Sequence, residues 1–97
     1  MFLFQALILR GLDALSADET IRLAISTLTN VYPKNVHIAK DSLTSISSGF
    51  GFVELNSIQE ATIVLQILQN VQPVFEIDGK QINVDYSKNN YTTAYVL

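Results

Sequence analysis

The sequence predicts an α+β domain in which a four-stranded antiparallel sheet is covered on one face by two helices. Short apolar segments and longer segments of helical periodicity follow one another in the order strand, helix, strand, strand, helix, strand. Both helical segments begin with a Ser-x-x-Glu pattern, which is typical of a helix start. An Asp-Gly pair near the end of the chain indicates a tight hairpin.

The strand predictions rest on short runs of branched apolar residues bounded by turn-forming residues. The predicted strands are residues 6–10, 36–39, 50–55 and 80–86. Gly11 ends the first of them, and the polar residues 41–48 form a loop between the second and third. Asp78 and Gly79 separate residues 75–77 from the last strand and predict a type I′ turn there.

The helix predictions rest on capping boxes followed by apolar stripes. Ser16 with Glu19, and Ser57 with Glu60, have the spacing at which a hydroxyl and a carboxylate each bind a free backbone N–H of the first turn. Apolar residues then recur at i, i+3, i+4 and i+7, namely Ile21, Ala24, Ile25 and Leu28, and again Ala61, Val64, Leu65 and Leu68. Asn30 and Pro33 should end the first helix. The resulting β-α-β-β-α-β order is that of the ferredoxin-like sandwich.

Composition limits the classes of protein that this chain can be. Its 97 residues, of which 48% are hydrophobic, suffice for one domain with a core, and the absence of cysteine excludes disulfide scaffolds and thiolate sites. Residues 1–9 are apolar but lack the flanks of a signal peptide and fall short of the roughly 20 residues that span a bilayer. We therefore expect no membrane partner. The expected organisation is a linker at residues 1–4, the domain at residues 5–88 and an extension at residues 89–97.

A candidate binding site lies on the third predicted strand. Residues 48–55 read Ser-Gly-Phe-Gly-Phe-Val-Glu-Leu and match five of the seven defined positions of an octamer found in RNA-binding domains. Alternation along the strand turns Gly51, Val53 and Leu55 toward the helices and Phe50 and Phe52 toward the open face. Two aromatic rings on an open sheet predict platforms for unpaired bases, each stack being worth roughly 1–3 kcal/mol.

An alternative explanation of the two rings stays open. The C-terminal segment or a partner protein would bury them, or the strand would have two apolar faces. In particular, Tyr91 and Tyr95 lie in a tail that could fold across the sheet and compete with RNA.

The octamer, in its place as third strand of this order, resembles that of the RNA-recognition-motif (RRM) family, and residues 7–12 resemble the family's hexamer. The resemblance covers residues 5–88. The chain departs from the family pattern at Ile8, often aromatic, at Ser48, normally basic, and at Leu55, normally aromatic.

The chain looks more closely like the second RRM of the RNA-binding motif protein five, six and ten group. This closer resemblance rests on residues 7–12, the octamer, and residues 65–69, 77–80 and 84–86. It implies a fragment of a multidomain nuclear regulator of alternative splicing. The implied partners are single-stranded pre-mRNA and splicing-factor proteins. An aliphatic residue at the position of Ile8 is common in this group.

Strand alternation adds further candidates on the open face. Arg10 and Lys88 are candidate phosphate or base contacts. For Lys88, and for Lys40, a solvated charge without a ligand is at least as good an interpretation. The remaining candidates are Ile8 on the first strand, His37 and Ala39 on the second, and Asn83, Asp85 and Ser87 on the last. The polar residues of the last strand would bind the edges of splayed bases.

Two other functional classes are weighed against RNA binding. Charged residues make up only 15% of the chain and the net charge is −3, so a protein-interaction RRM with vestigial RNA binding is the main rival. An enzyme of the same architecture, such as an acyl-phosphate hydrolase, is the other alternative, but the sequence contains no loop of the kind that binds phosphate in such enzymes. His37 is the only histidine and has no second ligand or nucleophile at a telling spacing. We therefore predict no catalytic residue, metal or cofactor.

Overall fold

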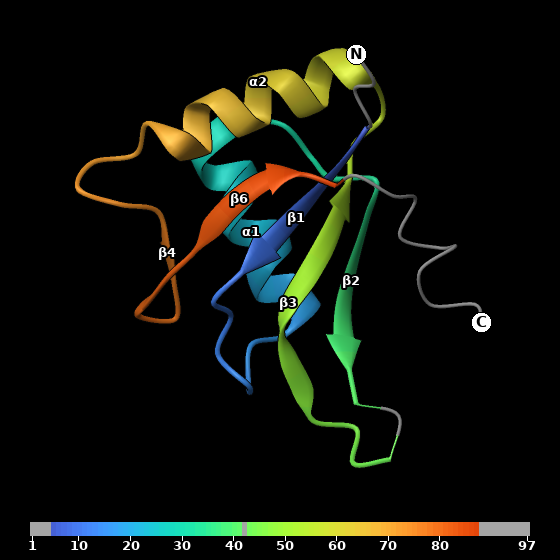
Figure 1. Ribbon diagram of the computed structural model, residues 1–97. Helices are drawn as coiled ribbons and strands as arrows, with labels where there is room; N and C mark the ends of the chain where they lie inside the picture. The colour runs from blue at the N-terminus through green and yellow to red at the C-terminus, as the bar shows by residue number, and fades with distance from the viewer. Residues whose placement is uncertain (1–4, 42, 88–97) are drawn as a thin grey trace.

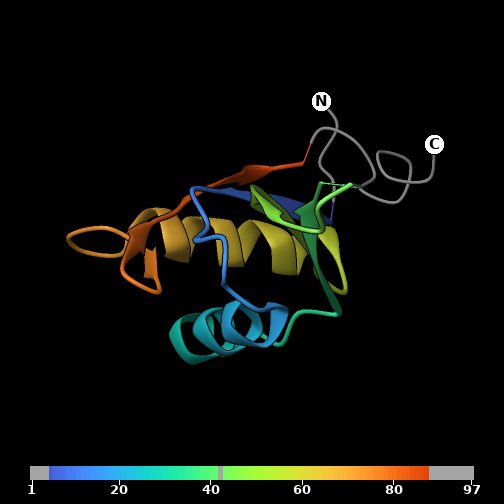
Figure 2. The same cartoon turned by 90° about the horizontal axis from the view of Figure 1, so that it is seen from below.

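The computed structural model, which describes residues 5–41 and 43–87, has one layer of strands and one layer of helices (Figure 1). The elements are β1 Ala6–Arg10, α1 Asp18–Thr29, β2 Asn35–Lys40, β3 Ser47–Glu54, α2 Ile58–Gln69, β4 Glu76–Ile77, β5 Lys80–Gln81 and β6 Asn83–Tyr86. The main sheet has the strand order β2-β3-β1-β6 with every pair antiparallel. Both helices lie on the same side of it (Figure 2). The predicted ferredoxin-like α+β fold is confirmed.

The core lies between the sheet and the two helices. Leu7 and Leu9 of β1 and Val53 of β3 are almost completely buried and face the helix layer. The predicted inward stripe of α2 is confirmed, because all four of its residues are buried. Burial of these side chains is the main term that holds the two layers together, at roughly 1.5–3 kcal/mol for each large apolar side chain.

The predicted stripe of α1 is wrong at its last position. Ile21 and Ile25 are buried, but Leu28 is 46% exposed and Thr29 takes the inward position in the last turn. The Thr29 hydroxyl donates to the carbonyl oxygen of Ile25 at 2.7 Å. A polar side chain whose hydrogen bond is made within the helix can be buried at little cost.

The predicted capping box at Ser16 does not form. α1 has Ala17 as its N-cap residue, with no side-chain cap. The Ser16 hydroxyl instead donates to Oδ2 of Asp78 at 2.6 Å, across 62 residues of sequence. Ser16 is buried, so this bond ties the start of α1 to the β4–β5 hairpin.

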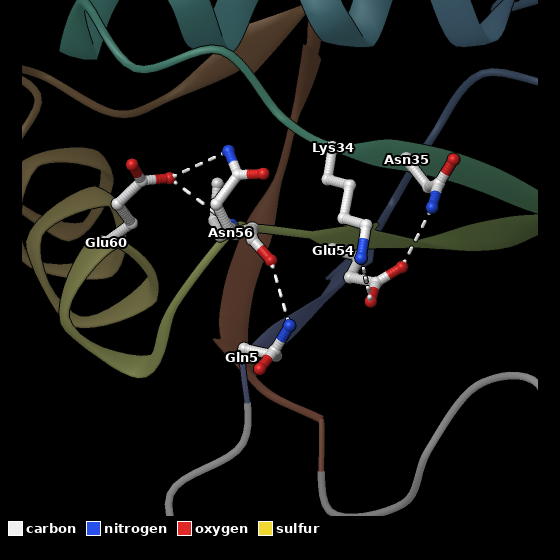
Figure 3. A network of polar contacts seen from close by, with 7 residues as sticks. Gln5, Lys34, Asn35, Glu54, Asn56 and Glu60 are labelled. Atoms are coloured by element: carbon white, nitrogen blue, oxygen red, sulfur yellow. Dashed lines mark hydrogen bonds and ion pairs between the residues drawn. The ribbon is translucent and has the colours of Figure 1, made fainter.

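The second capping box forms in part. The Ser57 hydroxyl accepts from the backbone N–H of Glu60 at 3.0 Å, as predicted. The Glu60 carboxylate accepts from the backbone and side-chain N–H groups of Asn56, both at 3.3 Å, rather than from Ser57 (Figure 3). The start of α2 is therefore fixed by its own sequence, whereas the start of α1 depends on a distant partner.

The type I′ hairpin is confirmed, but residues 80–86 do not form one strand. Asp78 and Gly79 have φ values of 53° and 76°, the positive values that this turn requires. The backbone N–H of Ile82 donates to the Phe75 carbonyl at 2.9 Å, which extends the β4–β5 pairing by one residue. Ile82 is buried, and after it the chain continues as β6 beside β1.

Gly51 allows β2 to lie close to β3. A Cβ atom at this position would be 3.0 Å from the carbonyl oxygen of His37 and 3.3 Å from Cδ1 of Leu12. Any side chain here would push β2 outward. Packing of β2 against β3 thus requires a glycine at position 51 of the octamer, whether or not a ligand binds.

The β2–β3 loop is organised by the carboxylate of Asp41. Its Oδ1 accepts from the backbone N–H groups of Leu43 at 2.8 Å and Thr44 at 3.1 Å. These backbone hydrogen bonds stabilise the ionised carboxylate and hold the pKa of Asp41 below its ordinary value.

Replacing Ser16 tests the link between α1 and the hairpin. Ser16→Ala should lower the free energy of unfolding in urea by about 1 kcal/mol, because a hydrogen bond to a carboxylate is lost. Ser26→Ala, at a less buried position of α1, is the matched control and should change stability by less than about 0.5 kcal/mol. In an Asp78→Gly background, which keeps the turn conformation, the effect of Ser16→Ala should largely disappear. An unchanged effect in that background would contradict the link.

Lowering the pH tests the role of Asp41. A depressed pKa in the folded state means that the contribution of Asp41 is present above its unfolded pKa and is lost as the pH falls through the folded value. The amide NMR signals of Leu43 and Thr44 should therefore shift together at a pH below 3.8. In Asp41→Asn this joint transition should be absent. Its persistence in that variant would assign the transition to another group.

Candidate nucleic-acid interface

The sheet surface opposite the helices, here called the open face, arranges the predicted site residues in rows across the strands. Seven of them occupy two neighbouring rows: His37, Phe52, Ile8 and Asp85 in one, and Phe50, Arg10 and Asn83 in the other. Directly opposed residues in antiparallel strands have Cβ atoms about 4.5–5.5 Å apart. The open face therefore brings together side chains that are up to about eighty positions apart in sequence, as Ile8 and Asp85 are.

Exposure differs among these residues. The side chains of Arg10, His37, Asn83 and Asp85 are exposed, whereas Ile8 and Phe50 are half-buried. The open face thus offers polar and charged groups around an apolar centre. Such a surface suits a ligand that has both a flat apolar face and polar edges.

Phe52 lies on the predicted face, but the prediction that its ring is open to water is wrong. Phe52 is only 7% exposed. It occupies an interior position of the sheet, with Ile8 and His37 opposite it on the neighbouring strands. The ring of Phe50 meets it edge to face, with centroids 6.0 Å apart and planes at 81°. Phe50 therefore presents more of its ring to a ligand than Phe52 does.

Ser87 and Ala39 are also less accessible than alternation predicted. Ser87 is 2% exposed, and its backbone N–H continues the β1–β6 ladder by donating to the carbonyl of Ala6 at 2.9 Å. Ala39 is 2% exposed and lies where the register between β2 and β3 shifts. Alternation alone cannot foresee either effect, because one arises at a strand end and the other at a β-bulge.

A third row of the open face carries a carboxylate that is already bound. Glu54 lies opposite Asn35, whose side-chain amide donates to Glu54 Oε1 at 2.9 Å, and Lys34 Nζ lies 3.9 Å from Oε2 (Figure 3). The backbone N–H of Lys34 also donates to the Glu54 carbonyl at 2.7 Å. The charge of Glu54 is thereby largely offset, and the start of β2 is fastened to the end of β3.

Gln5 extends this network to β1. Its side-chain amide donates to the carbonyl of Leu55 at 3.2 Å (Figure 3). The backbone carbonyl of Gln5 accepts from the backbone N–H of Leu55 at 2.8 Å. These bonds continue the β1–β3 pairing beyond the ends of the two strands. The network therefore defines one end of the open face.

Arg10 and Asp85, the two charged residues nearest the apolar centre, do not form an ion pair with each other. The guanidinium of Arg10 makes no hydrogen bond or ion pair within residues 5–41 and 43–87. Oδ1 of Asp85 accepts from the backbone N–H of Tyr86 at 2.8 Å. The Tyr86 ring turns to the other side of the sheet, where its hydroxyl donates to Thr62 of α2 at 3.0 Å. Arg10 and Asp85 are thus left available on the open face.

Three residues that the sequence analysis singled out cannot be compared with the structure. Lys88, Tyr91 and Tyr95 lie outside the described residues. Within the described ranges, no group of three or more His, Asp or Glu residues could hold a metal ion. No helix in that part of the chain is long and apolar enough to cross a membrane.

Comparison with curated proteins finds relatives over most of the chain. RNA-binding protein 5-B of Xenopus laevis is 36% identical over 88 residues, which is 91% of this chain and 12% of that protein. Human RNA-binding protein 6 is 31% identical over 81 residues, which is 84% of this chain and 7% of that protein. The chain thus spans about a tenth of the length of these relatives. No family model matches the chain.

Comparison with solved structures finds the same fold. The second RRM domain of the yeast poly(U)-binding protein has a TM-score of 0.71 at 24% identity, covering 88% of this chain and 95% of that domain. A Sex-lethal protein–RNA complex has a TM-score of 0.71 at 18% identity, covering 90% of this chain and 48% of that chain. The chain therefore has the fold of an RNA-recognition motif and resembles the corresponding segment of the RNA-binding protein 5 and 6 group.

Proposed function

We propose that this domain binds single-stranded RNA across the open face, as one module of a multidomain regulator of pre-mRNA splicing in the nucleus. The observation that carries the RNA proposal is the row formed by Phe50, Arg10 and Asn83, in which a half-buried aromatic ring has an unpaired cation and an exposed amide beside it. RNA-binding proteins 5-B and 6 are so named, and Sex-lethal is seen with RNA. The splicing and nuclear roles rest on the resemblance to that group.

Phe50 is the proposed stacking platform and Phe52 its support. The edge-to-face contact between the two rings holds Phe50 in one orientation, and such aromatic pairs contribute about 0.5–1.5 kcal/mol beyond burial. A base that stacks on Phe50 would gain roughly 1–3 kcal/mol. Because Phe52 is buried, its direct share of the stacking surface is small.

The proposed affinity is modest because few cations reach the open face. Arg10 is available for a phosphate or base contact, whereas Lys34 is engaged with Glu54. His37, Asn83 and Asp85 add polar contacts to base edges. We expect a dissociation constant on the order of 10⁻⁵ M or weaker for the isolated domain, and neighbouring modules would raise the affinity through avidity.

A protein-docking function is the second candidate, and exposed apolar side chains on the helical side favour it. Leu23 of α1 is 67% exposed, Ile63 of α2 is 49% exposed, and Tyr32 after α1 is 71% exposed. These residues do not lie on the open face. The two functions therefore use different surfaces and can be separated by mapping.

Replacing Phe50 tests the RNA proposal. Phe50→Ala should weaken binding of short single-stranded RNA by about tenfold or more, because a stacking surface is lost, while Phe50→Tyr should retain binding. Tyr32→Ala, which removes an exposed aromatic ring away from the open face, is the matched control and should bind as the parent does. The measurement is a titration of isotope-labelled domain followed by amide NMR shifts. Equal affinities for parent and Phe50→Ala would contradict the proposal, as would shifts confined to the helices.

Replacing Phe52 should act mainly on stability. Phe52→Ala removes a buried aromatic ring and should lower the free energy of unfolding by about 3–5 kcal/mol, whereas Phe50→Ala should cost less. Urea denaturation of both variants measures the difference. A stability loss for Phe52→Ala no larger than for Phe50→Ala would mean that the Phe52 ring is not part of the packed structure.

A further inference from the structure

We propose that Asp85, together with Arg10, makes the open face select a base that carries an exocyclic amino group and reject uracil. This inference rests on the proposed RNA-binding function and names the ligand at one position of the site. It depends on where the two charged side chains lie, on what they bind within the domain and on the chemistry of base edges.

The two side chains are diagonal neighbours on adjacent strands. Asp85 lies opposite Ile8, and Arg10, two residues farther along β1, lies opposite Asn83. Both are exposed, on the same face of the sheet. Diagonal pairs in a sheet are within reach of long side chains, yet this pair forms no ion pair. An acceptor and a donor therefore stand side by side, each free to bind a third group.

The Asp85 carboxylate is oriented before any ligand arrives. Its Oδ1 accepts the backbone N–H of Tyr86 at 2.8 Å, and Tyr86 is anchored in turn through its hydroxyl to Thr62 of α2. Oδ2 has no hydrogen bond to any residue in the described ranges. A fixed acceptor loses little conformational entropy on binding and so discriminates more sharply than a mobile one.

Ile8 makes edge contacts decisive at this position. It lies between Phe52 and Asp85 in the same row and is half-buried. Aromatic stacking binds all bases alike, whereas an aliphatic side chain gives a base only an apolar contact. The hydrogen bonds at the base edge then decide which base is preferred.

The edges of the four bases differ in the way that an Asp–Arg pair can read. Cytosine and adenine present an amino donor beside a ring-nitrogen acceptor, and guanine presents an amino and a ring N–H donor beside a carbonyl acceptor. A carboxylate next to a guanidinium complements each of these edges. Uracil has its single N–H between two carbonyl oxygens. The guanidinium can donate to one of them, but a carboxylate that accepts from the N–H still faces the lone pairs of the other, a repulsion that none of the three amino-bearing edges imposes. Uracil is therefore the base that this pair disfavours.

Cytidine and uridine oligonucleotides of equal length provide the test, because their rings have the same size and differ at the amino group. By NMR titration, the domain should bind the cytidine oligonucleotide about tenfold more tightly than the uridine one. Asp85→Asn should reduce this ratio to near one or reverse it, because an amide can donate to a uracil carbonyl and accept from its N–H. Glu76→Gln removes the same charge at an exposed position on β4, outside the main sheet, and should leave the ratio unchanged.

The outcomes separate this inference from the function on which it rests. If both oligonucleotides bind equally and Phe50→Ala still weakens binding, the domain binds RNA but Asp85 does not select the base. A ratio that Asp85→Asn and Glu76→Gln change to the same degree would show a charge effect and also overturn the inference. If neither oligonucleotide nor a purine-rich one shifts any amide of the sheet, the proposed function fails and the inference fails with it.

Discussion

The antiparallel pairing of β1 with β3 at the centre of the sheet is the constraint on which the rest of the structure depends. Its register places Ile8 opposite Phe52 and Arg10 opposite Phe50. A slip of one residue would exchange the two faces of a strand, and would send the two aromatic rings into the core and the buried Val53 into solvent. Burial of the apolar face therefore fixes the register, and the register in turn determines which side chains lie together on the open face.

The centre of the open face is as buried as parts of the core. Phe52 is as buried as Ile82 and Val84, which face the helix layer, although it lies on the opposite side of the sheet. Gly51, next to it, lets the backbone of β2 approach closely. Stability and ligand binding are consequently coupled here, and a substitution at the middle of the octamer changes both. Phe50 and Asp85, nearer the rim, are better placed to vary with ligand preference alone.

Sequence reasoning succeeded where the determining interactions are local. The bounds of β1, the type I′ turn at Asp78 and Gly79, and the buried stripe of α2 follow from alternation, turn chemistry and helical periodicity. It failed where a distant partner decides. The Ser16 hydroxyl binds Asp78 instead of capping α1, and Phe52 is 7% exposed on a face that strand alternation predicts to be open, with Ile8 of β1 and His37 of β2 opposite it. No window of sequence around either residue contains its partners.

The distribution of charge decides what kind of RNA binding this face can support. Of its charged groups, Glu54 is bound by Lys34 and Asn35, which leaves Arg10 and Asp85 beside the apolar centre. With so few cations, phosphate contacts contribute little affinity and little salt dependence, since each contact changes the slope of log K against log salt by only about 0.7 for a single strand. A face with so few free cations therefore gains more from hydrogen bonds to base edges than from contacts with the RNA backbone. Under the proposed function, tight binding would come from linkage to other modules, whose effective concentration would compensate for the phosphate contacts that this domain lacks.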